Sequence, residues 1–272
     1  MLDCVSENLD ALAVPYSFGS YHWTLTDYLG ETAMGWPDVS SAYGVFDLAA
    51  FAKDSAVLMQ TWWRGDCTTV ALSPTDWTAP VAPGAAIDVA ALTCAPQAEL
   101  FVNGVSQGVK PVALHRAAVW PQVAFAPGNV TAVARDAAGA ALGSATVLTA
   151  GAPTALRAWV ESPYLPPRNG SVITADGADV ALIGVEVIDA AGVVCPRGAA
   201  NITFTVSGPG VVYGVANGDP SDHSPPKAAW RLSFHGRARA IVASSAPGAT
   251  GAIAVTAAAD GLQPAVVTIT AA

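Results

Sequence analysis

Cysteine can bind a metal ion, act as a nucleophile or form a disulfide, so the spacing of the cysteines shows which chemistry is open to this chain. Four are scattered along the sequence, at Cys4, Cys67, Cys94 and Cys195. None lies in the close pairs that structural metal sites use. We expect buried free thiols, and we expect Cys94 and Cys195 to be unbridged because they lie in different modules.

Histidines offer the other common route to metal or acid–base chemistry. His115, His223 and His235 lie far from one another and have no companion at ligand spacing. We interpret each as a structural or surface residue rather than a metal ligand. The sequence therefore predicts no metal site and no cofactor.

Aromatic and carboxylate side chains gather in residues 21–31, whose sequence is YHWTLTDYLGE. The tripeptide GWP follows at residues 35–37, and SSAYGVFDL follows at residues 40–48. The segment DLAAFAK occupies residues 47–53. This combination is too specific to arise from composition alone.

These segments resemble glycoside hydrolase family 2. Its β-galactosidase-like members carry a W-T-x-x-D-Y-x-G-E run at the last barrel strand, then a serine-rich turn and a D-L-A-x-F-x-K segment. Residues 99–104, ELFVNG, are similar to the family's E-L-F-x-N-G hairpin. Residues 208–210 and 217–220 are similar to its G-P-G and N-G-D-P turns, so the resemblance covers nearly the whole chain.

The resemblance implies retaining hydrolysis of a glycosidic bond by two glutamates about 5 Å apart at the rim of a (β/α)8 barrel. Both glutamates normally lie on earlier strands. Glu7 follows Ser6, as the family nucleophile often follows a serine, but it lies in a helix-like segment only sixteen residues before Trp23. We interpret Glu7 as a solvated helix carboxylate and expect no catalytic residue in this chain.

The resemblance also implies three substrate-binding candidates. Trp23 would end the last barrel strand, where an aromatic face can pack on a sugar ring, although a core tryptophan is the alternative. Asp27 and Glu31 could orient sugar hydroxyls, or they could be carboxylates that cap a loop. His22 alternates with Trp23 along the expected strand and should point away from the site.

Residues 1–66 must position these side chains. We expect a helix over residues 5–12 with Ser6 as a possible cap, a strand over 16–26, a loop over 27–43 and a helix over 48–63. One βα unit cannot pair its strand or cover both faces of it. We therefore expect residues 1–66 to be the C-terminal remnant of a (β/α)8 barrel, and the chain to be the C-terminal part of a larger protein.

From Val70 onward, short β-branched runs alternate with turn residues. Asn103-Gly104 predicts a type I′ hairpin, and the tetrapeptide DAAG recurs at residues 136–139 and 189–192. The fold class we expect is mainly β, with two immunoglobulin-like sandwiches over residues 74–150 and 153–271. We expect loops at residues 163–168 and 221–226, and we favour core packing over sugar platforms for Trp77, Trp120 and Trp230.

Composition excludes some partners. The net charge of −9 and the pI near 4.7 give no attraction to phosphate backbones or anionic lipid, so we expect neither nucleic acid nor a membrane as a partner. The chain starts without a recognisable leader. Three sequons, at Asn129, Asn169 and Asn201, could carry glycans on a secretory route, which leaves the compartment open.

The sequence thus predicts a C-terminal fragment of a family 2 glycosidase that resembles β-galactosidase and is inactive alone. Its partners would be a β-galactoside-type carbohydrate in the full-length parent and the missing N-terminal catalytic barrel. The alternative is a non-catalytic carbohydrate-binding or adhesion module built from β-sandwiches.

Overall fold

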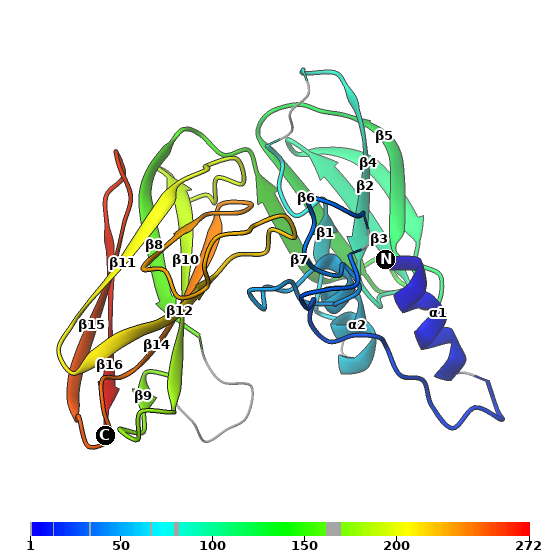
Figure 1. Cartoon of the computed structure of the whole chain (residues 1–272). Coiled ribbons are helices and arrows are strands. Elements are labelled where there is room, and N and C mark those ends of the chain that lie inside the picture. The colour runs from blue at the N-terminus through cyan, green and yellow to red at the C-terminus, as the bar shows by residue number, and fades with distance from the viewer. Residues whose placement is uncertain (1, 13, 33, 66, 79–81, 162–169) are drawn as a thin grey trace. The chain divides into compact units, whose positions relative to one another are not determined.

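Strands dominate the protein from residue 71 onward, while the two helices of the described residues lie before residue 65 (Figure 1). This confirms the mainly β class. By internal contacts the chain divides into a first unit, residues 1–27, 42–47 and 51–149, and a second unit, residues 28–41, 48–50 and 150–272. The computed structural model describes residues 2–12, 14–32, 34–65, 67–78, 82–161 and 170–272.

Helices α1 (Leu2–Leu12) and α2 (Asp54–Arg64) belong to the first unit. Val5 and Leu9, four residues apart on α1, are buried in a cluster with Leu58 of α2. Ser6 is not the cap that the sequence suggests, because it lies inside α1, where its hydroxyl donates a 2.6 Å hydrogen bond to the carbonyl oxygen of His115.

The start of α2 also differs from the expected helix over 48–63. Residues 47–51 form a turn instead, in which the carboxylate of Asp47 accepts a 2.9 Å hydrogen bond from the amide of Phe51. The helix starts at Asp54 and ends at Arg64, and it is capped by Gly65, whose φ of 67° is left-handed and readily adopted by glycine.

The expected strand over residues 16–26 is not formed. Within this segment the structure shows a β-bridge only for Thr26, which pairs with Phe46. A strand needs a run of hydrogen-bonded neighbours, and in the described part of the first unit only the end of this segment has them, where the backbone of Thr24 and Leu25 bonds to residues 43–46. A barrel unit is therefore not seen in the described residues, and the apolar side chains of the segment are left exposed: Tyr16 91%, Phe18 96%, Tyr21 90%, Trp23 71% and Leu25 66%.

The first sandwich pairs a three-stranded sheet in the order β1-β2-β5 with a four-stranded sheet in the order β4-β3-β6-β7, all antiparallel. Trp77 and Trp120 are 1% and 3% exposed in the core between the sheets, which confirms that they pack there. The strands are β1 (Ala71–Ser73), β2 (Ala86–Leu92), β3 (Gln97–Val102), β4 (Val105–Pro111), β5 (Ala118–Ala124), β6 (Asn129–Arg135) and β7 (Ala141–Leu148).

The predicted hairpin at Asn103-Gly104 is confirmed. Both residues have positive φ, 50° and 80°, as a type I′ turn requires. The Asn103 side chain also donates to the carbonyl of Pro127 at 3.0 Å and accepts from the amide of Asn129 at 2.8 Å. One turn residue therefore fixes the β3–β4 hairpin and anchors the start of β6.

The second sandwich pairs sheets in the orders β12-β14-β10-β8 and β13-β11-β15-β16-β9. Ile183, Phe204, Ile253 and Ile269 lie in its core at no more than 1% exposed. The strands are β8 (Pro153–Val160), β9 (Val172–Ile173), β10 (Val180–Asp189), β11 (Asn201–Ser207), β12 (Gly210–Ala216), β13 (Trp230–Leu232), β14 (Arg237–Ser244), β15 (Gly251–Ala258) and β16 (Ala265–Ala271).

Trp230, expected in the core, is 39% exposed at the start of the short strand β13, so that prediction is wrong. The repeated DAAG turn is confirmed at both positions, since Asp136 and Asp189 each accept backbone amides of their own turn. The expected loop at residues 163–168 and the sequon at Asn169 lie outside the described residues, whereas Asn129 and Asn201 start strands β6 and β11.

A buried ion pair organises the connection between β12 and β13. Arg231 and Asp222 are 5% and 10% exposed at their side chains, and Arg231 Nη1 lies 2.6 Å from Asp222 Oδ2. Arg231 Nη2 also donates to the carbonyls of Val215 and Pro225. Burial by itself raises the pKa of Asp222, but hydrogen bonds from Ser224 and Arg231 outweigh it and lower the pKa to about 2.

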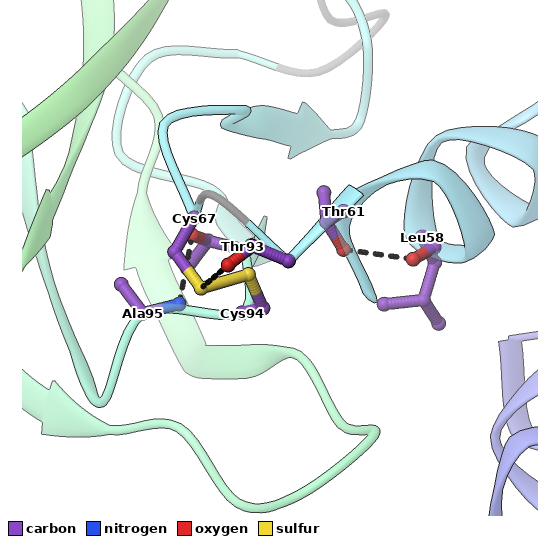
Figure 2. Close-up of a disulfide and its surroundings, with 7 residues drawn as sticks. Leu58, Thr61, Cys67, Thr93, Cys94 and Ala95 are labelled. Atoms are coloured by element: carbon purple, nitrogen blue, oxygen red, sulfur yellow. Dashed lines mark hydrogen bonds between the residues drawn. A yellow bond between two sulfur atoms is a disulfide. The ribbon is translucent and has the colours of Figure 1, made fainter. Parts of the chain in front are cut away.

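A disulfide joins Cys67, just after α2, to Cys94, just after β2 (Figure 2). The prediction that Cys94 is unbridged is therefore wrong. The prediction rested on the separation of Cys94 from Cys195, which do lie in different units. It did not consider Cys67, which lies in the same unit as Cys94. Cys195 is free and buried in the second sandwich, as predicted.

We predict that Cys94→Ser lowers the free energy of unfolding of the first unit by about 2–4 kcal/mol, because the disulfide restricts the unfolded chain over 27 residues of sequence separation. Urea unfolding with and without reductant measures this. Reductant should destabilise the unmodified protein and leave the variant unchanged. Equal sensitivity of both proteins, or failure to find a Cys67–Cys94 peptide by mass spectrometry, would contradict the bridge.

Removing the carboxylate opposite Arg231 should be costly. Asp222→Asn leaves a buried guanidinium without its charged partner, and we expect a loss of about 3 kcal/mol in the free energy of unfolding of the second unit. The matched control is Asp260→Asn at an exposed carboxylate, expected to change stability by less than about 0.5 kcal/mol.

The stability of the second unit should also depend on pH. Because the folded pKa of Asp222 lies below the unfolded one, its contribution to the free energy of unfolding is present above about pH 4 and lost toward pH 2. Urea unfolding from pH 7 to pH 2 should show this loss in the unmodified protein and not in Asp222→Asn.

Candidate substrate-binding loop

The candidate site residues lie on one loop, whose two ends are joined by backbone hydrogen bonds. Some of these bonds lie in the first unit and some in the second. In the first unit the amide of Asp27 donates to the carbonyl of Phe46 at 3.0 Å, and the amide of Val45 donates to that of Thr24 at 3.1 Å. In the second unit Leu29 pairs with Ser40 in an antiparallel bridge, where Gly30 donates to the carbonyl of Val39 at 2.8 Å. The loop is therefore tied together by its own backbone.

Asp27 stabilises the loop from inside. Its Oδ1 accepts a 2.8 Å hydrogen bond from the amide of Gly44, and its Oδ2 lies 2.6 Å from Lys53 Nζ. The side chain is only 7% exposed. A Cβ at Gly44 would lie 2.2 Å from the backbone nitrogen of Asp27, so only glycine fits there. These contacts describe a loop-capping carboxylate, and contact of Asp27 with a substrate stays a prediction.

Trp23 has an exposed indole on an anchored backbone. It is 71% exposed, and the amide of the next residue, Thr24, lies 3.3 Å from the carbonyl of Tyr43. An indole with a fixed backbone is available to pack on the apolar face of a sugar at little entropic cost. His22 is bound elsewhere, with Nδ1 3.3 Å from Asn8 Nδ2 and Nε2 3.3 Å from the carbonyl of Tyr43.

Glu31 lies in the second unit. It is exposed, has a left-handed φ of 46°, and its carboxylate accepts a hydrogen bond from the hydroxyl of Tyr28. Glu7 is exposed on α1 in the first unit. Trp23 and Asp27 thus share one unit and Glu31 belongs to the other.

Sequence reasoning missed the residues that hold the tip of the loop. Trp36 is 84% exposed, and its ring meets the ring of His223 edge to face with centroids 4.8 Å apart. His223 Nε2 lies 2.8 Å from the carbonyl oxygen of Pro37. His223, expected to be structural or surface, is therefore a contact of the loop. The only signal in the sequence was that GWP and N-G-D-P both belong to the family resemblance.

The histidines of the sandwiches fit structural roles in other ways. His115 Nδ1 lies 2.9 Å from a carboxylate oxygen of Asp10, and the His115 ring packs edge-on against Trp62. His235 packs against Phe234. In the part of the chain that is described, no three His, Cys, Asp or Glu side chains gather as a metal ion would need, and no helix is long and apolar enough to span a membrane.

The sequence matches known protein families and individual relatives. Residues 168–268 match the family described as glycoside hydrolase family 2 C-terminal domain 5, and residues 84–143 match a domain family of unknown function. The chain is 38% identical over 255 residues to Beta-galactosidase BoGH2A of Bacteroides ovatus, a match that covers 93% of this chain and 28% of that protein. It is 28% identical over 242 residues to a putative beta-glucuronidase of Formosa agariphila, covering 84% of this chain and 22% of that protein.

Solved structures agree. The crystal structure of a beta-glycosidase from Bacteroides vulgatus superposes with a TM-score of 0.85 and 28% identity, covering 98% of this chain and 32% of that one. The chain thus spans about a third or less of the length of these relatives. Together with the loop sequence, these matches identify the chain as a C-terminal portion of the glycoside hydrolase family 2 type.

Proposed function

We propose that the chain is the accessory and loop-bearing part of a glycosidase that hydrolyses O-glycosidic bonds, with β-galactosides as first candidate substrates. The observation that carries this is the 38% identity, over 93% of the chain, to a protein named a beta-galactosidase. The weaker match to a putative beta-glucuronidase makes β-glucuronides the second substrate class to test.

The exposed apolar side chains of residues 16–25 support a role as part of a larger catalytic body. Five of them are 66–96% exposed within a ten-residue segment, which is unusual for a surface that stays in water. We propose that the remaining strands of a family 2 (β/α)8 barrel cover the side chains of this segment other than Trp23, leave the Trp23 indole open to the sugar, and supply both catalytic glutamates. Residues 1–66 would then be the last part of that barrel.

Within this body the candidate residues have different roles. Trp23 presents its indole to the sugar ring, and Glu31 presents a carboxylate that Tyr28 orients toward sugar hydroxyls. Asp27, through Lys53 and the amide of Gly44, holds the loop backbone within the first unit. In this proposal none of these residues transfers a proton or attacks the anomeric carbon.

The Cys67–Cys94 disulfide also suggests where the protein works. Structural disulfides persist in oxidising compartments and are rare in the cytosol. We therefore propose that the protein works outside the cytosol.

We predict that the purified chain does not hydrolyse an aryl β-galactoside. Stabilising an oxocarbenium-like transition state requires a paired acid and nucleophile, and general acid catalysis alone is commonly worth about 10²–10⁴-fold. Glu7→Gln, assayed beside the unmodified chain, identifies contaminating enzyme, which would be equally active in both preparations. Turnover that disappears in the variant would show that Glu7 is catalytic and that the chain is not inert.

A chimera tests the substrate-binding role directly. This chain replaces the matching C-terminal part of Beta-galactosidase BoGH2A, and aryl β-galactoside hydrolysis is measured. We expect an active chimera in which Trp23→Ala lowers kcat/KM by about 10- to 100-fold, the size of a lost aromatic contact. Trp63→Ala, at an exposed tryptophan of α2, is the matched control and should have little effect. An inactive chimera that folds, or equal effects of both variants, would count against the proposal. Galactose binding by the isolated chain with the same Trp23 dependence would favour the carbohydrate-binding module instead.

A further inference from the structure

We propose that the turn at residues 217–224 of the second sandwich is a clamp that positions the loop at residues 28–41, with Ser221 and His223 as its positioning residues. The clamp itself rests on contacts within the second unit. Its consequence for a substrate rests on the proposed function.

The contacts of the clamp join residues more than 180 positions apart in the sequence. The hydroxyl of Ser221 donates to Asp38 Oδ1 at 2.6 Å, and His223 Nε2 donates to the carbonyl of Pro37 at 2.8 Å. The amide of Val39 donates to the carbonyl of Pro220 at 2.8 Å. Three hydrogen bonds therefore fall on three consecutive loop residues, 37–39, and the Trp36 ring packs against His223 next to them.

The turn can act as a clamp because buried groups make it rigid. Asn217 is 5% exposed, and its amide donates to both Asp222 Oδ2 and the carbonyl of Leu232 at 2.8 Å. Asp222 is in turn paired with the buried Arg231, which also binds carbonyls on either side of the turn. Asp219 Oδ1 accepts the amide of Ser221 at 2.8 Å. Ser221 and His223 are thus presented from a fixed backbone.

The loop needs such a support at its tip. Its base is tied by the Leu29–Ser40 bridge, and Ser40 and Ser41 are almost fully buried. Toward the tip, Met34 and Trp36 are both 84% exposed, so packing contributes little to ordering them. The hydrogen bonds from the second sandwich replace that packing.

Fixing the tip has a chemical consequence. Glu31 and Trp36 lie on this loop, and substrate contacts assist catalysis only when their side chains are held within a fraction of an ångström. The second sandwich would therefore act on the site through the loop without touching the substrate.

Hydrogen–deuterium exchange of the full chain tests the clamp. Ser221→Ala and His223→Ala should each speed amide exchange in residues 28–41, including Val39, by about tenfold, the size expected for loss of a hydrogen bond to a charged or fixed partner. Exchange in the core strands β10 and β14 should not change. Ser245→Ala, at an exposed serine of the same sandwich, is the matched control. His223→Gln retains a side-chain N–H donor and should restore much of the protection.

Two results would overturn the clamp: loop exchange that is unaffected by both variants, or exchange in the unmodified protein as fast as in an unfolded peptide. In an active chimera with Beta-galactosidase BoGH2A, His223→Ala should also lower kcat/KM several-fold while Ser245→Ala does not, and an unchanged kcat/KM would overturn the positioning role. An inactive chimera would count against the proposed function alone, because exchange decides the clamp without it.

Discussion

A β-strand can satisfy its backbone only through neighbouring strands, and this requirement separates the parts of the chain that fold within themselves from the part that does not. Both sandwiches meet it, since every named strand pairs within a sheet. The segment at residues 16–25, predicted as a strand, meets it only at its end, where the backbone of Thr24 and Leu25 bonds to residues 43–46. It therefore lies as an irregular chain with its aromatic side chains exposed.

The same requirement explains which elements could be predicted from the sequence. The hairpin at Asn103-Gly104 and the two DAAG turns depend on local chemistry, namely positive φ and an aspartate that accepts its own turn's amides. Local chemistry is visible in a single sequence. The strand at 16–26 was predicted from the same kind of pattern, but its existence depends on partners that no local pattern reports.

Interactions between distant residues were the ones that sequence reasoning missed. Serine is a common helix cap, yet the hydroxyl of Ser6 donates a hydrogen bond to the carbonyl of His115, 109 positions away. Cys67 and Cys94 carry no spacing signal, because α2 and β2 bring them together only after folding. Of the candidate site residues, Trp23 and Glu31 are exposed, whereas the ion pair that the little-exposed Asp27 carboxylate makes with Lys53 could not be predicted from the motif.

The clamp on the loop shows why an accessory sandwich can matter to a site that it does not contain. A loop that presents polar and aromatic groups to a ligand cannot bury many of its own side chains, so it must be ordered by hydrogen bonds from outside. In this chain those bonds come from a turn stiffened by the buried pair of Arg231 and Asp222, in which Arg231 donates both to the Asp222 carboxylate and to the carbonyls of the chain on either side of the turn. The buried ion pair thereby makes the turn rigid, and the position of Trp36 depends on this turn.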